Sequence, residues 1–169
     1  ESLERNWGVV PSVSFIDASG QYHETEWLPR MRSLTVMPSP FLTDVFEPLM
    51  AAHPEERWLG LWETNRGCPF SCTFCDWGSN TKSKVMKFDL ETLYQELEWF
   101  AKHKIEYIFV CDANFGIFPR DVEIARHAAN IKNQYGYPLS LSIQNAKKNH
   151  THSYMCSRCI SHHSRKRQK

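Results

Sequence analysis

The chain has 169 residues, of which 41% are hydrophobic and 13% aromatic, a composition typical of a globular protein and not of a disordered one. Its formal net charge of +1 excludes a strongly acidic or basic protein, although every acidic residue lies before residue 124. No apolar run reaches the ~18 residues that a membrane span needs, so we expect no membrane association. Six cysteines without a secretory signal favour a reducing compartment, and we therefore expect a cytoplasmic protein.

Residues 1–57 read as an irregular N-terminal arm. Two short strands are expected over residues 12–16 and 21–24, where β-branched and aromatic residues flank a turn that ends in Gly20. Prolines interrupt the stretch that follows, and only a short helix over residues 46–52 is expected there.

The pattern becomes regular from residue 58 onward, where apolar residues recur with the periods of strands and helices. We expect, in chain order, a strand over 57–64, a helix over 89–104, a strand over 105–112, a helix over 118–136 and a strand over 138–145. Strands that alternate with helices predict an α/β fold with a parallel sheet. In such sheets ligands bind at the carboxyl ends of the strands.

Three cysteines lie within eight residues of the loop that follows the first of these strands. Cys68, Cys72 and Cys75 have the spacing C-x₃-C-x₂-C in "GCPFSCTFCDWGS". Three thiolates on one short loop can bind a soft metal or an iron–sulfur cluster and leave one ligand position open. A structural zinc site and a set of buried free cysteines are the two alternatives.

With Phe74 before its last cysteine, "RGCPFSCTFCDWGS" resembles the cluster-binding loop of the radical S-adenosylmethionine (radical SAM) superfamily. The resemblance implies that Cys68, Cys72 and Cys75 bind three irons of a [4Fe–4S] cluster and that S-adenosylmethionine binds the fourth. It implies an enzyme that cleaves S-adenosylmethionine reductively to a 5′-deoxyadenosyl radical, for radical chemistry on an unidentified organic substrate of small or modest size. A flavodoxin or ferredoxin is the implied electron donor, and the catalytic residues stay unknown.

The same resemblance suggests four residues that contact the cofactor. The family's second strand ends in a segment that contacts the amino group of S-adenosylmethionine, and Asp112 and Asn114 occupy that place here. Phe74 would lie beside the adenine, and Gln144 ends the third strand, where it could face cofactor or substrate. Each also has an ordinary structural reading: turn capping for Asp112 and Asn114, loop packing for Phe74 and strand termination for Gln144.

Three segments, "CDWGS", "DANFG" and "LSIQNAKKN", together resemble the subgroup that carries a cobalamin-binding domain before the radical SAM core. The chain has no D-x-H-x-x-G cobalamin signature, so cobalamin would bind through a domain that is not present in this chain. The implied fold is a partial (β/α) barrel of the radical SAM type, truncated to about the first three βα units, over residues 58–149.

Residues 150–169 form a basic tail without apolar periodicity, which we expect to be disordered and to lie outside the domain. It could be an aberrant end on a truncated gene model, a genuine disordered tail, or a metal clip built from Cys156, Cys159, His162 and His163. We expect no nucleic-acid partner because the body of the chain is acidic. The alternative function is a non-catalytic zinc-binding module that uses the cysteine cluster with a ligand from this tail.

Overall fold

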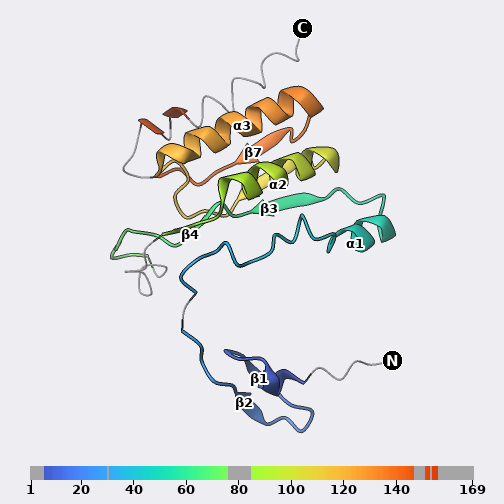
Figure 1. Cartoon of the computed structure of the whole chain (residues 1–169), viewed down its shortest axis with the longest axis vertical. Coiled ribbons are helices and arrows are strands. Elements are labelled where there is room, and N and C mark those ends of the chain that lie inside the picture. Colours follow the sequence, from blue (N-terminus) through green and yellow to red (C-terminus); the bar gives the residue numbers. More distant parts are fainter. Residues whose placement is uncertain (1–5, 30, 76–84, 147–150, 153, 156–169) are drawn as a thin grey trace. The chain divides into compact units, whose positions relative to one another are not determined.

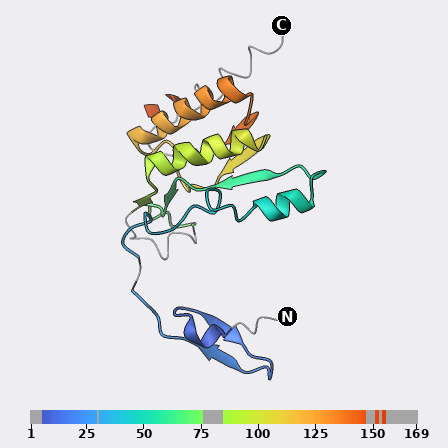
Figure 2. The same cartoon turned by 45° about the vertical axis from the view of Figure 1, so that its right-hand side comes forward.

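The computed structural model describes residues 6–29, 31–75, 85–146, 151–152 and 154–155. The chain divides into two compact units, Glu1–Arg32 and Ser33–Lys169. Figures 1 and 2 show the elements of each unit in two views. The domain boundaries expected from the sequence, at residues 57 and 149, stay predictions.

The first unit contains η1 (Trp7–Val9), β1 (Ser14–Ile16) and β2 (Tyr22–Glu24). β1 and β2 lie within the two strands that the sequence predicts and pair antiparallel, and their hairpin turn is organised by Asp17. The Asp17 carboxylate accepts hydrogen bonds from the backbone and hydroxyl of Ser19 and lies 2.7 Å from the ring of His23. The hydrogen bonds from Ser19, and then that from His23, hold the pKa of Asp17 well below its usual range.

The second unit contains α1 (Glu47–Ala52), β3 (Leu59–Trp62), β4 (Asn65–Arg66), β5 (Met86–Lys87), α2 (Leu90–Lys102), β6 (Tyr107–Val110), α3 (Pro119–Tyr135) and β7 (Ser140–Ser142). Three of its strands form a parallel sheet in the order β3-β6-β7. The predicted α/β fold with a parallel sheet is therefore confirmed, with strands a few residues shorter than expected. Parallel pairing places the carboxyl ends of all three strands at one edge of the sheet.

Helices α2 and α3 lie along one face of this sheet (Figure 1). α2 begins at the cap Asp89, whose carboxylate accepts a hydrogen bond from the Thr92 N–H, and it buries an apolar face. α3 begins at Pro119 and ends at Tyr135, and the residue that follows, Gly136, adopts the left-handed conformation with φ 84° that commonly ends helices. The core between sheet and helices consists mainly of Trp62, Leu93, Leu97, Phe100, Ile108, Val110, Phe115, Ile124 and Leu141.

The other face of the edge strand β3 is open. Leu59 and Leu61 are 66% and 67% exposed, whereas Gly60 and Trp62, which alternate with them, are buried against the helices. This alternation is the ordinary consequence of the two-residue period of a strand.

The two-stranded β4–β5 ladder is a feature that the sequence pattern did not predict. It pairs Asn65 with Lys87 and Arg66 with Met86 in antiparallel register. Strands of two residues are too short to show a period, so only the fold reveals them.

The described part of the tail consists of residues 151–152 and 154–155, which are helical. The tail residues proposed as zinc ligands, Cys156, Cys159, His162 and His163, lie outside the described residues. No helix within the described ranges has the length and apolar character that crossing a membrane requires.

Candidate functional site

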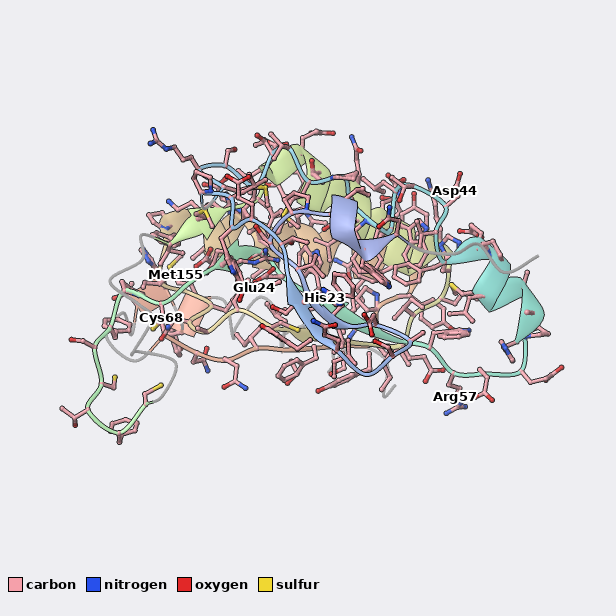
Figure 3. The ribbon with its side chains drawn as sticks, turned by 90° about the horizontal axis from the view of Figure 1, so that it is seen from below. His23, Glu24, Asp44, Arg57, Cys68 and Met155 are labelled. Atoms are coloured by element: carbon pink, nitrogen blue, oxygen red, sulfur yellow. The ribbon has the colours of Figure 1, made fainter. Side chains whose placement is uncertain are left out.

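The cysteine loop lies at the carboxyl edge of the parallel sheet. It follows β3, starts from β4 and returns to the domain at β5, so the β4–β5 ladder closes its base. The side chain of Cys68, labelled in Figure 3, lies at the start of this loop. A ligand held by the loop would therefore lie at the edge where parallel sheets position their ligands.

Cys68, Cys72 and Cys75 are free thiols that are each partly buried. The Cys75 N–H donates a hydrogen bond of 3.1 Å to the Cys72 carbonyl, which turns the chain between these two residues. Phe74, between them, is 82% exposed. Across the described ranges, no three His, Cys, Asp or Glu side chains are gathered as a ready-made metal site. The assignment of the three cysteines as cluster ligands, and of Phe74 to the adenine, thus stays a prediction.

Asn114 is the predicted cofactor residue that the structure brings to a cysteine. Its side-chain Nδ2 donates a hydrogen bond of 3.2 Å to the Cys68 Sγ. Asn114 is only 4% exposed and lies in the loop between β6 and α3. The carboxyl ends of β3 and β6 therefore meet through this contact, although the two residues are far apart in the sequence.

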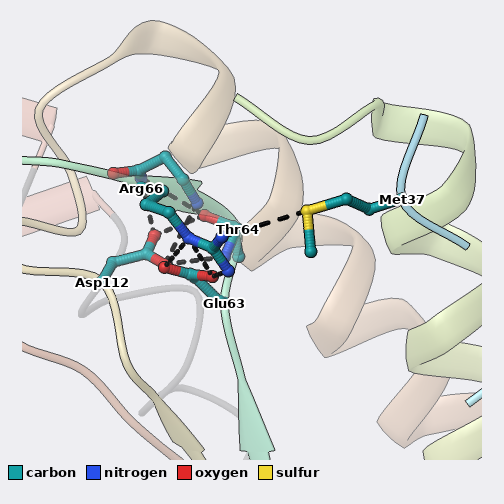
Figure 4. Close-up of polar contacts among 6 residues, drawn as sticks. Met37, Glu63, Thr64, Arg66 and Asp112 are labelled. Atoms are coloured by element: carbon teal, nitrogen blue, oxygen red, sulfur yellow. Dashed lines mark hydrogen bonds and ion pairs between the residues drawn. The ribbon is translucent and has the colours of Figure 1, made fainter. Parts of the chain in front are cut away.

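Asp112 lies in the same loop, two residues before Asn114, and has no exposed surface. Its Oδ1 accepts hydrogen bonds from the backbone N–H groups of Thr64 (2.7 Å) and Asn65 (3.2 Å). Its Oδ2 accepts from the Thr64 hydroxyl and from the Asn65 side-chain amide, the latter at 2.7 Å. We call Asp112, Thr64 and Asn65 together the Asp112 clamp. Figure 4 shows the contacts between Asp112 and Thr64.

The clamp fixes the stretch of chain that leads from β3 into the cysteine loop. Burial raises the pKa of Asp112 to about 6, against the opposing effect of its hydrogen bonds from Thr64 and Asn65. Both carboxylate oxygens of Asp112 accept hydrogen bonds from other residues of the protein. The predicted contact of Asp112 with the amino group of S-adenosylmethionine stays untested, and the contacts present are those of a residue that positions the loop.

Arg120, in the first turn of α3, also binds the base of the cysteine loop. Its guanidinium donates to the Phe88 carbonyl at 2.8 Å and to the Thr64 carbonyl at 3.3 Å. Thr64 precedes β4 and Phe88 follows β5, so one side chain joins both ends of the loop base to α3. Sequence reasoning missed Arg120 and Thr64, because an arginine on a helix and a threonine after a strand have no local signature. The sequence offered one hint, for Thr64 alone, because this residue ends the strand that is expected over 57–64.

Arg66, two residues before Cys68, forms an ion pair of 2.6 Å with Glu63. The hydrogen bonds and charge of Glu63 raise the pKa of Arg66. Its guanidinium also lies 3.9 Å from the Met37 sulfur (Figure 4). A pocket of about 290 Å³ lies beside this pair and is lined by residues of the segment 37–46 and of α2.

Gln144 lies at the same sheet edge, with its side chain exposed. Its backbone carbonyl accepts a hydrogen bond of 2.7 Å from Phe115, and the Phe115 carbonyl accepts one of 2.9 Å from Ala146. The end of the third strand is therefore joined to the loop that carries Asn114. The assignment of Gln144 to the cofactor or substrate stays a prediction.

Comparisons with known proteins identify relatives of this chain, although it matches no protein-family profile. It is 49% identical over 120 residues to the cobalamin-dependent radical SAM methyltransferase TokK of Streptomyces tokunonensis, an alignment that covers 70% of this chain and 18% of TokK. It is 45% identical over 156 residues to the 2-(S-pantetheinyl)-carbapenam-3-carboxylate methyltransferase of Streptantibioticus cattleyicolor, covering 88% of this chain and 22% of that enzyme. The chain thus spans about a fifth of the length of these curated relatives.

A solved structure of the apo, selenomethionine-labelled cobalamin-dependent S-adenosylmethionine radical enzyme OxsB has a weaker likeness. The match has 18% sequence identity and a TM-score of 0.48, and it covers 92% of this chain and 22% of OxsB. That similarity is too low to support a conclusion about this chain.

Proposed function

This chain is a homologue of cobalamin-dependent radical SAM methyltransferases over the segment that it shares with them, and we propose that it carries the cluster-binding part of such an enzyme. The observation that carries the proposal is the identity of 49% to a cobalamin-dependent radical SAM methyltransferase and of 45% to a second methyltransferase. The position of the cysteine loop at the carboxyl edge of the sheet supports it.

The proposed ligands of a [4Fe–4S] cluster are Cys68, Cys72 and Cys75. The donor set fits this group, because it consists of three free thiols on one short loop and leaves the fourth iron open. When bound, the cluster would supply the electron that cleaves S-adenosylmethionine to methionine and a 5′-deoxyadenosyl radical.

The residues around the loop would position it and the cofactor. The Asp112 clamp and Arg120 fix the loop base. Phe74 and Gln144 are the proposed contacts of S-adenosylmethionine, since both side chains are exposed and belong to segments at the carboxyl edge of the sheet.

We further propose methyl transfer to a small or modest-sized organic substrate as the reaction of the whole enzyme. The strands β3, β6 and β7 would form the first part of a (β/α) barrel, and cobalamin would bind through a domain outside this chain. A flavodoxin or ferredoxin would supply electrons in the cytoplasm. Methyl transfer and cobalamin rest on the names of the relatives, whereas the barrel, the electron donor and the cytoplasm rest on the sequence pattern and its resemblance to the radical SAM superfamily.

Anaerobic reconstitution of the chain with iron and sulfide tests the proposal. We expect uptake of a four-iron cluster, seen by absorption and iron analysis, and an EPR signal of the reduced chain that changes when S-adenosylmethionine is added. Cys72→Ala should abolish cluster formation because it removes one of three thiolate ligands.

The matched control is Cys111→Ala, which removes a thiol whose Sγ contacts the Phe109 carbonyl in the sheet, outside the cysteine loop. This variant should take up the cluster normally. One tightly bound zinc per chain without iron would instead support the zinc-binding module, and a reduced signal that ignores S-adenosylmethionine would contradict the proposed cofactor.

A further inference from the structure

The contact between Asn114 and Cys68 joins a neutral amide donor to the sulfur of the first cysteine in the loop. The distance of 3.2 Å between Nδ2 and Sγ is short for a hydrogen bond to sulfur. Asn114 is 4% exposed, so water does not compete strongly for its amide. A buried amide that donates to a cysteine sulfur is a specific electrostatic contact and more than loop packing.

The backbone on both sides of Asn114 is fixed. Two residues before it, the Asp112 carboxylate is bound by Thr64 and Asn65. Directly after it, Phe115 exchanges backbone hydrogen bonds with Gln144 and Ala146, at 2.7 and 2.9 Å.

The rest of the β6–α3 loop is fixed as well. Asp121 of α3 accepts hydrogen bonds through its Oδ2 from the backbone N–H groups of Gly116 and Phe118, both at 2.9 Å. The loop therefore presents the Asn114 amide to Cys68 from a rigid support, and this direction is set before any ligand binds.

A hydrogen bond to a cysteine sulfur stabilises the more electron-rich state of an iron–sulfur cluster. Hydrogen bonds to the sulfurs, net charge and solvent exposure set the reduction potentials of these clusters. Reduction adds one negative charge to the cluster, so the donor interacts more favourably with the reduced form. Removing the donor should therefore make reduction harder.

We infer that Asn114 is a positioning residue that tunes the cluster, raising its reduction potential through the hydrogen bond to Cys68; the inference rests on the proposed function. This contact uses the Asn114 Nδ2 donor. The predicted contact with the amino group of S-adenosylmethionine would use the Asn114 Oδ1 acceptor, and it stays a prediction.

Redox titration of the reconstituted chain, followed by EPR without S-adenosylmethionine, tests this inference. Asn114→Leu removes the donor at similar size, and we expect a fall in the equilibrium constant for reduction of roughly tenfold, a midpoint potential lower by about 59 mV for one electron. Asn114→Asp replaces the donor by a carboxylate, and we expect a larger shift in the same direction. Asn133→Leu, an exposed position of α3, is the matched control and should titrate like the unchanged chain.

Two results would overturn the inference while the proposed function stands. One is a normal cluster with an unchanged potential in both Asn114 variants. The other is loss of cluster uptake in both variants when the Asn133 control reconstitutes fully, which would make Asn114 a purely structural part of the loop. Failure of the unchanged chain to take up a four-iron cluster would instead overturn the proposed function and, with it, this inference.

Discussion

Asp112 shows at the scale of a single residue how the site is positioned. It is completely buried, and four hydrogen bonds from Thr64 and Asn65 reach its carboxylate. Burial nevertheless dominates, and it raises the pKa of this carboxyl from 3.8 to about 6. Because the folded-state pKa lies above the unfolded value, the folded protein binds the extra proton between these two pH values. The stability linked to Asp112 is present below about pH 4 and is lost as the pH rises through 6.

We therefore predict that Asp112→Asn changes the pH dependence of stability. The variant cannot titrate at this position. Its stability relative to the unchanged chain should therefore improve by about 2 kcal/mol between pH 4 and pH 7, from about 1.4 kcal/mol per pKa unit and the partial protonation of the unfolded carboxyl at pH 4. Chemical denaturation of both chains without metal at the two pH values measures the difference. An equal difference at both values would show that the pKa of Asp112 is not raised.

At the scale of an element, β3 combines two unlike faces. Gly60 lies under α2 and beside β6: a Cβ at this position would lie 3.0 Å from Phe100 and 3.1 Å from Ile108. On the opposite face, Leu61 is 67% exposed. Gly60 thus allows close packing between the sheet and α2. The Leu61 side chain, by contrast, is largely exposed and makes few contacts with the core.

Substitutions on the two faces of β3 should consequently differ in effect. Gly60→Val adds branched volume against Phe100 and Ile108, and we predict a loss of roughly 1–3 kcal/mol in the free energy of unfolding. Leu61→Val, on the other face of the same strand, should change it by less than about 0.5 kcal/mol. Denaturant unfolding followed by circular dichroism compares the two, and a Gly60→Val chain as stable as the Leu61→Val chain would contradict the packing argument.

At the scale of the whole molecule, the chain is organised as a hairpin unit and a larger α/β unit. In the larger unit, Arg120 of α3 and Asp112 of the β6–α3 loop both bind the base of the cysteine loop, through Phe88 and Asn65 respectively. A cluster bound by the three cysteines would bind the folded chain and not the unfolded one. A ligand that binds only the folded state raises the stability of the chain.

Removal of iron should accordingly destabilise the reconstituted chain. We predict that a chelator lowers its thermal midpoint, by about 4 °C for each kcal/mol of binding free energy lost. Cys72→Ala, carried through the same steps, should show one midpoint with and without chelator. A reconstituted chain that loses its iron with no change in midpoint would indicate that the cluster does not stabilise the fold.

Much of the fold could be predicted because its signals are local. The apolar periods of 89–104 and 118–136 predicted two helices, and α2 and α3 follow them closely. The alternation of strand and helix gave the parallel sheet. The β4–β5 ladder and the contacts of Arg120 could not be predicted, since each joins short segments that lie far apart in the sequence.

The sequence by itself determined the candidate ligands, because the spacing of Cys68, Cys72 and Cys75 within eight residues is covalent information. The described residues do not gather these three thiols as a metal site. It also placed Asp112 and Asn114 at a strand end. Only the tertiary structure decided what these two side chains contact. Hydrogen bonding depends on distance and direction across the sheet edge, so Asp112 binds Thr64 and Asn65 while Asn114 donates to Cys68.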